Sequence, residues 1–80
     1  MFIVYVLVSK KYIERIYIGL TQNISQRVDE HNSGKSSYSS KYGPWALATY
    51  VTFNHKKKAV EFEKYLKSGS GFAFLKKHFL

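Results

Sequence analysis

The chain has 80 residues, no cysteine and a net charge of +8, with 13 lysines and arginines against five acidic residues. That length allows one domain with a single small core, and the lack of cysteine excludes disulfides and a thiolate zinc site. No stretch approaches the roughly 18 apolar residues of a membrane span, and the start lacks the basic region of a secretion signal. We therefore expect one soluble, cytoplasmic domain over residues 1–80, with no membrane contact.

The first two predicted elements are strands. Residues 2–8 are continuously apolar and are β-branched or aromatic, which is typical of a central strand covered on both faces. Residues 9–14 are polar enough to be a hairpin connection, so residues 15–21 should form a second, antiparallel strand. Gly19 near the end of that strand indicates a close backbone approach or a bulge.

A helix is predicted next, starting after a cap at Thr21 or Asn23 and running to about residue 32. Gly34 lies just beyond it as a stop. Residues 33–43 show no periodicity and are interpreted as a loop, which is either a flexible linker or a phosphate-contacting segment. The basic residues of that loop are Lys35 and Lys41.

The second half of the chain predicts one strand and two helices. Residues 45–53 are predicted to be a strand. Asn54 then caps a helix that runs to residue 67. Residues 68–71 contain two glycines and should break that helix before a final one over residues 72–79. The expected order is β-β-α-β-α-α, and the strand should place four apolar residues on one face, namely Trp45, Leu47, Val51 and Phe53.

Glu63 is the charged residue that this pattern turns inward. On a wheel of 3.6 residues per turn it lies with Ala59, Phe62 and Leu66, whereas Glu61 points away among the lysines. Carboxylates are almost never buried unless they are paired or bind a cation. Glu63 is therefore expected either to form a salt bridge at the core edge or to bind a metal ion in a cleft.

The positive charge is concentrated in the second half of the chain. Residues 1–34 carry a balance of +1, from four basic and three acidic residues, and residues 35–80 carry +7, from nine lysines against two glutamates. Such a field favours a polyanion such as nucleic acid, although it could merely keep a small protein soluble. An anion would also relieve the repulsion between a helix N-terminus and the three lysines in its first turn, Lys56, Lys57 and Lys58.

Several chemically useful residues could meet at one end of a small sheet. Arg27 and His31 lie four residues apart beside the apolar stripe of their helix, and Tyr5 and Tyr17 lie on strands. Taken singly, each is more often a packing or surface residue. Together with Glu63 they offer what phosphoryl transfer needs: a cation site, a donor for developing negative oxygens and a proton acceptor.

These residues occur in the order and at the separations of the GIY-YIG nuclease superfamily, which the sequence resembles over essentially its whole length. Tyr17-Ile18-Gly19 matches the second half of the name motif, and Ile3-Val4-Tyr5 keeps the tyrosine of the first half but not its glycine. Residues 23–34 are similar to the arginine-bearing helix of the family, and residues 44–45 and 59–69 match its second half. Among subfamilies, the likeness is to small standalone proteins related to the nuclease end of the bacterial excision-repair incision subunit.

The resemblance implies an α+β fold with a small three-stranded antiparallel sheet flanked by helices. It implies one divalent ion, Mg²⁺ or Mn²⁺, on Glu63, and a contact from Arg27 to the scissile phosphate. Tyr5 or Tyr17 would position or deprotonate water. A free tyrosine has a pKa of about 10 and would need nearby cations to act as a base, whereas His31, with an ordinary pKa of about 6.5, accepts a proton more easily.

Two positions depart from the excision-repair pattern. Leu20 replaces a lysine that follows the glycine, and Leu75 lies where an asparagine is expected beyond the glutamate helix. Either loss could slow the chemistry without altering the fold.

Three functions therefore compete. The first is a metal-dependent DNA nuclease of modest sequence specificity, linked to DNA repair or processing, that acts on single-stranded, flapped or damaged DNA. The second is a weakly active or inactive nucleic-acid-binding module on the same scaffold. The third is a structural basic protein that docks on ribonucleoprotein, which would leave the inward Glu63 without an explanation. The oligomeric state does not follow from the sequence.

Overall fold

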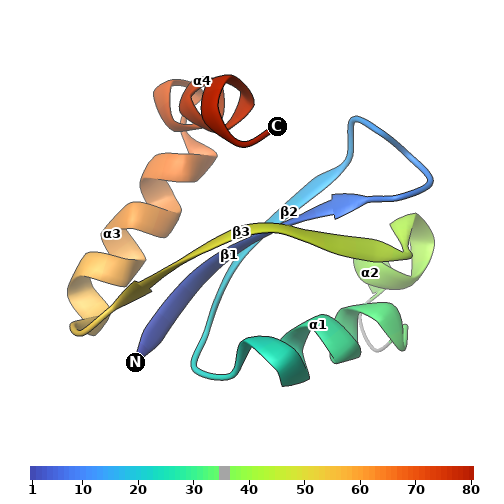
Figure 1. The fold of residues 1–80 in the computed structure, drawn as a ribbon, viewed down its shortest axis with the longest axis horizontal. Coiled ribbons are helices and arrows are strands. Elements are labelled where there is room, and N and C mark those ends of the chain that lie inside the picture. Colours follow the sequence, from blue (N-terminus) through green and yellow to red (C-terminus); the bar gives the residue numbers. More distant parts are fainter. Residues whose placement is uncertain (35–36) are drawn as a thin grey trace.

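The computed structural model describes residues 1–34 and 37–80 and has an α+β fold built on one three-stranded antiparallel sheet (Figure 1). The fold class expected from the resemblance is confirmed. The elements, in chain order, are β1 (Phe2–Ser9), β2 (Ile16–Thr21), α1 (Ile24–Asn32), α2 (Ser37–Tyr42), β3 (Trp45–Phe53), α3 (Lys56–Lys67) and α4 (Gly69–His78).

Strand β1 is the central strand of the sheet, whose order is β2-β1-β3. It is antiparallel to both neighbours, and its residues from Ile3 to Leu7 are buried. Both faces of this strand are covered, which is why its sequence is continuously apolar rather than alternating. Tyr5 lies opposite Gly19 on β2 and opposite Tyr50 on β3.

The two faces of the sheet carry different cores. Helices α3 and α4 cover one face and α1 lies against the other (Figure 1). The α3/α4 face holds an aliphatic cluster, made of Val4, Val6, Ile18, Ala59, Leu66 and Leu75. The α1 face holds an aromatic cluster of Tyr5, Leu7 and Trp45, against which Tyr17, Ile24, Val28 and Tyr42 pack.

Strand β3 differs from the predicted alternation. Val6 pairs with Thr49 but Leu7 pairs with Leu47, so Ala48 is an extra residue and forms a bulge. The bulge reverses the side-chain parity along the strand. Trp45 therefore packs in the cluster on the α1 face and Phe53 against the cluster on the α3/α4 face, and the prediction that they share one face is wrong.

The helix predictions need three further corrections. The segment interpreted as a loop contains α2, a helix of six residues. Helix α4 begins directly after Ser68, at Gly69 rather than at residue 72, and the Ser68 hydroxyl accepts a hydrogen bond from the Gly71 amide at 3.3 Å. The N-cap of α3 is His55 rather than Asn54, and its side chain makes no capping hydrogen bond.

The start and end of α1 follow the prediction. The Asn23 side chain accepts a hydrogen bond from the Gln26 amide at 3.0 Å, which makes Asn23 the N-cap. Gly34 has a φ of +79°, a conformation that glycine adopts without steric cost, and it ends the helix as expected. Within residues 1–34 and 37–80, none of the helices combines the length and the apolar character needed to cross a bilayer.

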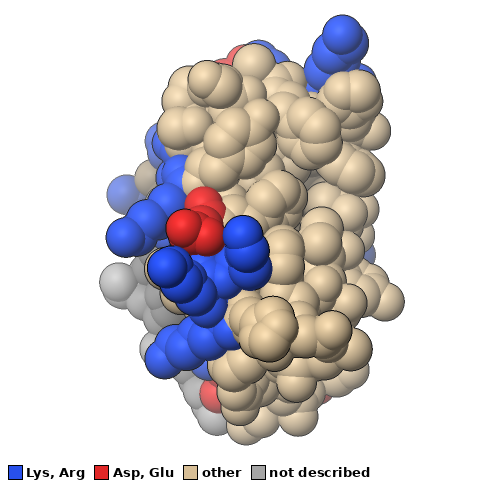
Figure 2. All heavy atoms as spheres, turned by 90° about the vertical axis from the view of Figure 1, so that its left-hand side faces the viewer, with Lys and Arg blue, Asp and Glu red and all other residues tan. Residues whose placement is uncertain are grey.

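Charge is unevenly distributed over the surface. Figure 2 views the molecule from the side on which α3 lies in Figure 1, and it shows lysine and arginine gathered along one side of that face with acidic residues among them. Much of the rest of the same face carries no charge. A polyanion would therefore meet one side of this face rather than all of it.

Candidate active site

The site is built around Tyr5, whose ring lies across the neighbouring strand. A Cβ placed on Gly19 would lie only 2.4 Å from the Tyr5 hydroxyl oxygen and 2.8 Å from its Cε1. Only a residue without a side chain leaves room for that ring. The close approach predicted at Gly19 is therefore present, although a side chain rather than a backbone makes it. Because β2 is an edge strand, the ring carries the Tyr5 hydroxyl toward the outer edge of the sheet.

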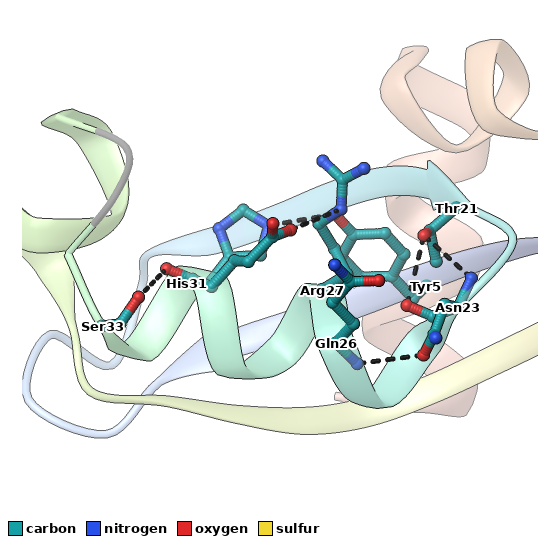
Figure 3. Close-up of polar contacts among 8 residues, drawn as sticks. Tyr5, Thr21, Asn23, Gln26, Arg27, His31 and Ser33 are labelled. Carbon is teal, nitrogen blue, oxygen red and sulfur yellow. Dashed lines mark hydrogen bonds and ion pairs between the residues drawn. The ribbon is translucent and has the colours of Figure 1, made fainter.

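Helix α1 supplies a histidine to this hydroxyl. Tyr5 Oη and His31 Nε2 are 3.0 Å apart, and the two residues are 1% and 5% exposed (Figure 3). The Tyr17 ring lies on the same imidazole, with ring centroids 4.4 Å apart, and is 6.2 Å from the Tyr5 ring. The structure thus brings together the two tyrosines and the histidine that the sequence singled out.

Both members of the hydrogen bond are held in their neutral forms. Burial, and next the neighbouring Tyr17, raises the pKa of the Tyr5 phenol well above its ordinary value, against a smaller opposing effect of Arg27. Burial, and next Arg27, lowers the pKa of His31, against the opposing effect of Glu30. A neutral imidazole accepts a proton, whereas the Tyr5 phenol resists losing one. That Tyr5 or Tyr17 positions or deprotonates water stays a prediction.

Arg27 lies on α1 one turn before His31, with its side chain exposed. Its Nε is 3.4 Å from Glu30 Oε1, and the two side chains are 46% and 34% exposed (Figure 3). Exposed pairs of this kind contribute about 0–1 kcal/mol. A phosphate could therefore replace the glutamate as the partner of the guanidinium at little cost.

Glu63, on α3, is half-buried, whereas Glu61 on the same helix is exposed. Its charge contributes to raising the Tyr5 pKa, so the carboxylate acts electrostatically on the same phenol as Arg27. Glu63 Oε2 is also 3.4 Å from Lys67 Nζ, with the two side chains 21% and 55% exposed. The salt bridge that the sequence left open as an alternative is therefore present, and its partner lies one turn along the same helix.

An open hollow lies beside this pair. It has a volume of about 260 Å³ and is lined by Ile16, Tyr17 and Ile18 of β2 and by Lys67 of α3. Glu63 is thus neither turned into bulk water nor sealed in the core. The hollow gives a substrate access to the sheet edge at Tyr17.

The donor set fits one hard divalent ion. Within residues 1–34 and 37–80, no three His, Cys, Asp or Glu side chains converge as a metal site. A metal ion on the predicted ligand Glu63 would therefore have a single carboxylate from this chain. Mg²⁺ is commonly held in this way, by one or two carboxylates together with water and substrate phosphates. Mg²⁺ or Mn²⁺ therefore fits these residues, whereas a closed zinc site does not.

The predicted nucleic-acid contacts are dispersed. Lys35 lies outside the described residues, and Lys41 lies on α2 with its Nζ 5.4 Å from the Tyr42 ring centre. The other three, Lys56, Lys57 and Lys58, are exposed in the first turn of α3. None of the described lysines in this set contacts the Tyr5–His31 pair.

The two departures from the excision-repair pattern are core residues. Leu75 is 1% exposed in the aliphatic cluster, and Leu20 packs against that cluster. The sequence prediction missed Glu30 and Lys67, the ion-pair partners of Arg27 and Glu63. Their spacings of three and four residues on a helix are the signal that could have revealed them.

The structure is a small α+β domain with a phenol–imidazole pair on one face of its sheet, an exposed arginine on α1 and a half-buried carboxylate on α3. The model of the GIY-YIG catalytic domain matches residues 1–77. The chain therefore belongs to the GIY-YIG family, which is a family of nucleases, and the resemblance noted from the sequence is confirmed.

Individual relatives agree with that assignment. A structure-specific endonuclease subunit SLX1 homolog of Giardia intestinalis is 38% identical over 59 residues, which are 69% of this chain but only 16% of that protein. The UPF0213 protein CPE1444 of Clostridium perfringens is 34% identical over 64 residues, 79% of this chain and 69% of that one. The solution NMR structure of the UPF0213 protein BH0048 from Bacillus halodurans superposes with a TM-score of 0.57 at 30% identity, covering 96% of this chain and 84% of that one.

Proposed function

We propose that the chain is a metal-dependent nuclease that hydrolyses phosphodiester bonds of DNA with low sequence specificity. The observation that carries the proposal is the 3.0 Å contact between Tyr5 and His31 beside Tyr17, in the electrostatic field of both Arg27 and Glu63. Four separate elements, β1, β2, α1 and α3, contribute these side chains. The net charge of +8 supports a polyanionic substrate.

Single-stranded, flapped or damaged DNA is the proposed substrate class, in DNA repair or processing. The SLX1 homolog is described as a structure-specific endonuclease subunit, which supports branched or flapped DNA over a long cognate site, although this chain spans a small part of that protein. Lys41 and Lys56–Lys58 are proposed to contact the flanking phosphates. Such contacts make affinity fall steeply with salt concentration.

Arg27 is proposed to contact the scissile phosphate. A guanidinium makes paired, charge-assisted hydrogen bonds to phosphate oxygens and stabilises the charge that develops on them. Its present partner, Glu30, is 34% exposed, so solvent screens the ion pair that the phosphate would replace.

Glu63 is proposed to hold one divalent ion, Mg²⁺ or Mn²⁺. When bound, such an ion offsets the phosphate charge and lowers the pKa of water. The Glu63 side chain is 21% exposed, so its carboxylate can be reached from solvent, and its ion-pair partner Lys67 lines the hollow.

The proton-transfer roles follow from burial. Tyr17 lines the hollow, so it is the phenol placed to orient water or substrate. Tyr5 is 1% exposed and acts through its hydrogen bond to His31. His31 is kept neutral by burial and by Arg27, so it is the proposed proton acceptor, and Tyr5 holds its ring in place.

A binding module without turnover is the second candidate. The observation that favours it is that the two charged site residues each have a partner in the protein, Glu30 for Arg27 and Lys67 for Glu63. A domain that only binds DNA would keep such pairs.

A cleavage assay separates the two. Purified protein is incubated with labelled single-stranded, duplex and flapped oligonucleotides, with Mg²⁺, Mn²⁺ or chelator. Glu63→Gln is compared with Glu61→Gln, its exposed neighbour on the same helix. We expect metal-dependent cleavage that Glu63→Gln and Arg27→Ala abolish and Glu61→Gln preserves. Binding without cleavage under each metal would leave only the binding module, and cleavage that survives both substitutions would place the chemistry elsewhere.

A further inference from the structure

Lys67 is the side chain of this region to which neither the sequence pattern nor the proposed chemistry gives a role. It lies one helical turn after Glu63 on α3, with its Nζ 3.4 Å from Glu63 Oε2. It also lines the hollow that Tyr17 borders. Of the four residues that line this hollow, the other two, Ile16 and Ile18, are apolar, so Lys67 provides its positive charge.

The position of Lys67 conflicts with metal binding at Glu63. The Lys67 ammonium lies 3.4 Å from a carboxylate oxygen of Glu63, and Lys67 rather than Glu63 lines the hollow. A divalent ion on the same carboxylate would repel the ammonium, since two cations at such a distance raise the electrostatic free energy. The lysine side chain is 55% exposed and has a flexible four-carbon stem, so it can move away at little cost.

The hollow also offers the ammonium a second partner. A phosphate that reaches Tyr17 would enter the space that Lys67 lines. Leu20, which follows Gly19 on β2, packs in the aliphatic cluster and brings no cation to this edge. Lys67 on α3 would then supply the cation that Leu20 does not.

We propose that Lys67 is an exchangeable counter-ion of Glu63. Its ammonium pairs with the Glu63 carboxylate when no divalent ion is bound, and it contacts a phosphate of the nucleic acid when an ion takes its place. The proposal rests on the proposed function for the identity of the substrate. It makes Lys67 a competitor of the ion for Glu63 and a binding residue for the phosphate.

The exchange predicts effects of opposite sign on two ligands. Lys67→Met removes the cation that competes for Glu63, so Mn²⁺ should bind the nucleic-acid-free protein about threefold more tightly, the change expected for losing an exposed ion pair. The same substitution removes a phosphate contact. The affinity for a short, hydrolysis-resistant single-stranded oligonucleotide, measured at saturating Mn²⁺ so that the ion occupies Glu63, should therefore fall several-fold, with the slope of log K against log[salt] reduced by about 0.7.

The experiment uses Mn²⁺ titration followed by electron paramagnetic resonance, and oligonucleotide binding followed by fluorescence anisotropy over a range of salt. Lys64→Met, which removes an exposed lysine from the same helix, is the matched control for net charge. Lys67→Arg restores a cation and should return both the Mn²⁺ affinity and the oligonucleotide affinity toward their wild-type values. Neither measurement requires turnover, so a wild-type protein that fails to cleave DNA defeats the proposed function and leaves this test intact.

Three results would overturn the inference. If Lys67→Met and Lys64→Met have the same affinities for both ligands, the Glu63–Lys67 pair is an ordinary contact on the helix surface. A fall in both affinities would show that Lys67 supports the ion rather than competing with it. Wild-type protein that binds no Mn²⁺ would remove the exchange altogether.

Discussion

The two faces of the sheet are built from the same strands but carry different side chains. On the α3/α4 face, β1 and β2 contribute Val4, Val6 and Ile18 to an aliphatic core. On the α1 face, the Tyr5 hydroxyl contacts His31 and the Tyr17 ring packs against the same imidazole. Because side chains alternate along a strand, one pair of strands can hold both a core and a site. The comparison teaches that the α3/α4 face holds the aliphatic core, whereas the α1 face holds the phenol–imidazole pair of the proposed site.

Gly71 on the α3/α4 side and Gly19, whose added Cβ would meet Tyr5 on the α1 side, make this difference testable. A Cβ on Gly71 would lie 1.8 Å from the Tyr65 carbonyl oxygen, where α4 crosses the end of α3. Backbone cannot swing aside, so Gly71→Ala should lower the free energy of unfolding by about 3 kcal/mol or more. Chemical denaturation measures this, with Gly69→Ala as the control. Gly69 has no heavy atom within 4 Å of an added Cβ, so its substitution should be neutral or stabilising, by up to about 1 kcal/mol. Equal losses in both variants would contradict the account.

Gly19→Ala should separate chemistry from stability. The added Cβ meets the Tyr5 ring, 2.4 Å from its hydroxyl oxygen, and a side chain can yield where backbone cannot. We expect the ring to leave His31, the free energy of unfolding to fall by about 1–3 kcal/mol and DNA cleavage to fall about 100-fold. Denaturation and single-turnover cleavage on the same sample test this. Full activity in a folded Gly19→Ala protein would show that the Tyr5–His31 contact is not needed.

The pH dependence of stability should come from the α1 face. His31 has a lowered pKa in the folded protein, because of burial and then of Arg27, so the unfolded chain binds a proton first as pH falls. Stability is therefore fully present above the unfolded pKa of about 6.5 and is lost below it, by at most about 1.4 kcal/mol per pH unit. Denaturation between pH 7.5 and 5 should show this fall, and His31→Gln should flatten it. A His31→Gln profile that keeps the full wild-type slope would assign the titration to other groups.

Tyr5→Phe is the smallest of these changes. It removes the hydroxyl bonded to His31 Nε2 but keeps the buried ring, so stability should fall by about 1 kcal/mol. Tyr65→Phe is the matched control, since Tyr65 lies on α3 and is 42% exposed. The control should change neither stability nor cleavage, whereas Tyr5→Phe should slow cleavage. Indistinguishable variants would remove the functional difference between the two faces.

Local signals in the sequence predicted the elements that depend on local interactions. The apolar run of β1, the Asn23 cap and the stop at Gly34 are all readable from neighbouring residues and are all present. The bulge at Ala48 is set by pairing with a distant strand, so no local pattern revealed it. Gly71 was interpreted as part of a helix break. The sequence could not show that it is needed for its close approach to Tyr65, because that contact depends on how α4 packs on α3.

The site was predicted less completely than the fold. The helical wheel turned Glu63 toward the protein, and the structure finds it half-buried, but its partner on the same helix, Lys67, was overlooked. The wheel placed Arg27 and His31 side by side but could not show that Arg27 is exposed and His31 is buried. Burial depends on how α1 packs on the sheet, which the spacing of residues along one helix does not determine.

Paramagnetic broadening by Mn²⁺ tests the central claim most directly, because it locates the ion relative to both faces. In an ¹⁵N-labelled sample, substoichiometric Mn²⁺ should broaden the amide signals around Glu63 together with those of Tyr17 and Ile18 across the hollow. Glu63→Gln should abolish the effect, and Glu61→Gln should preserve it. Broadening centred on His55 or His78, or equal in wild type and Glu63→Gln, would contradict a single site shared by the α3 carboxylate and the phenol–imidazole pair.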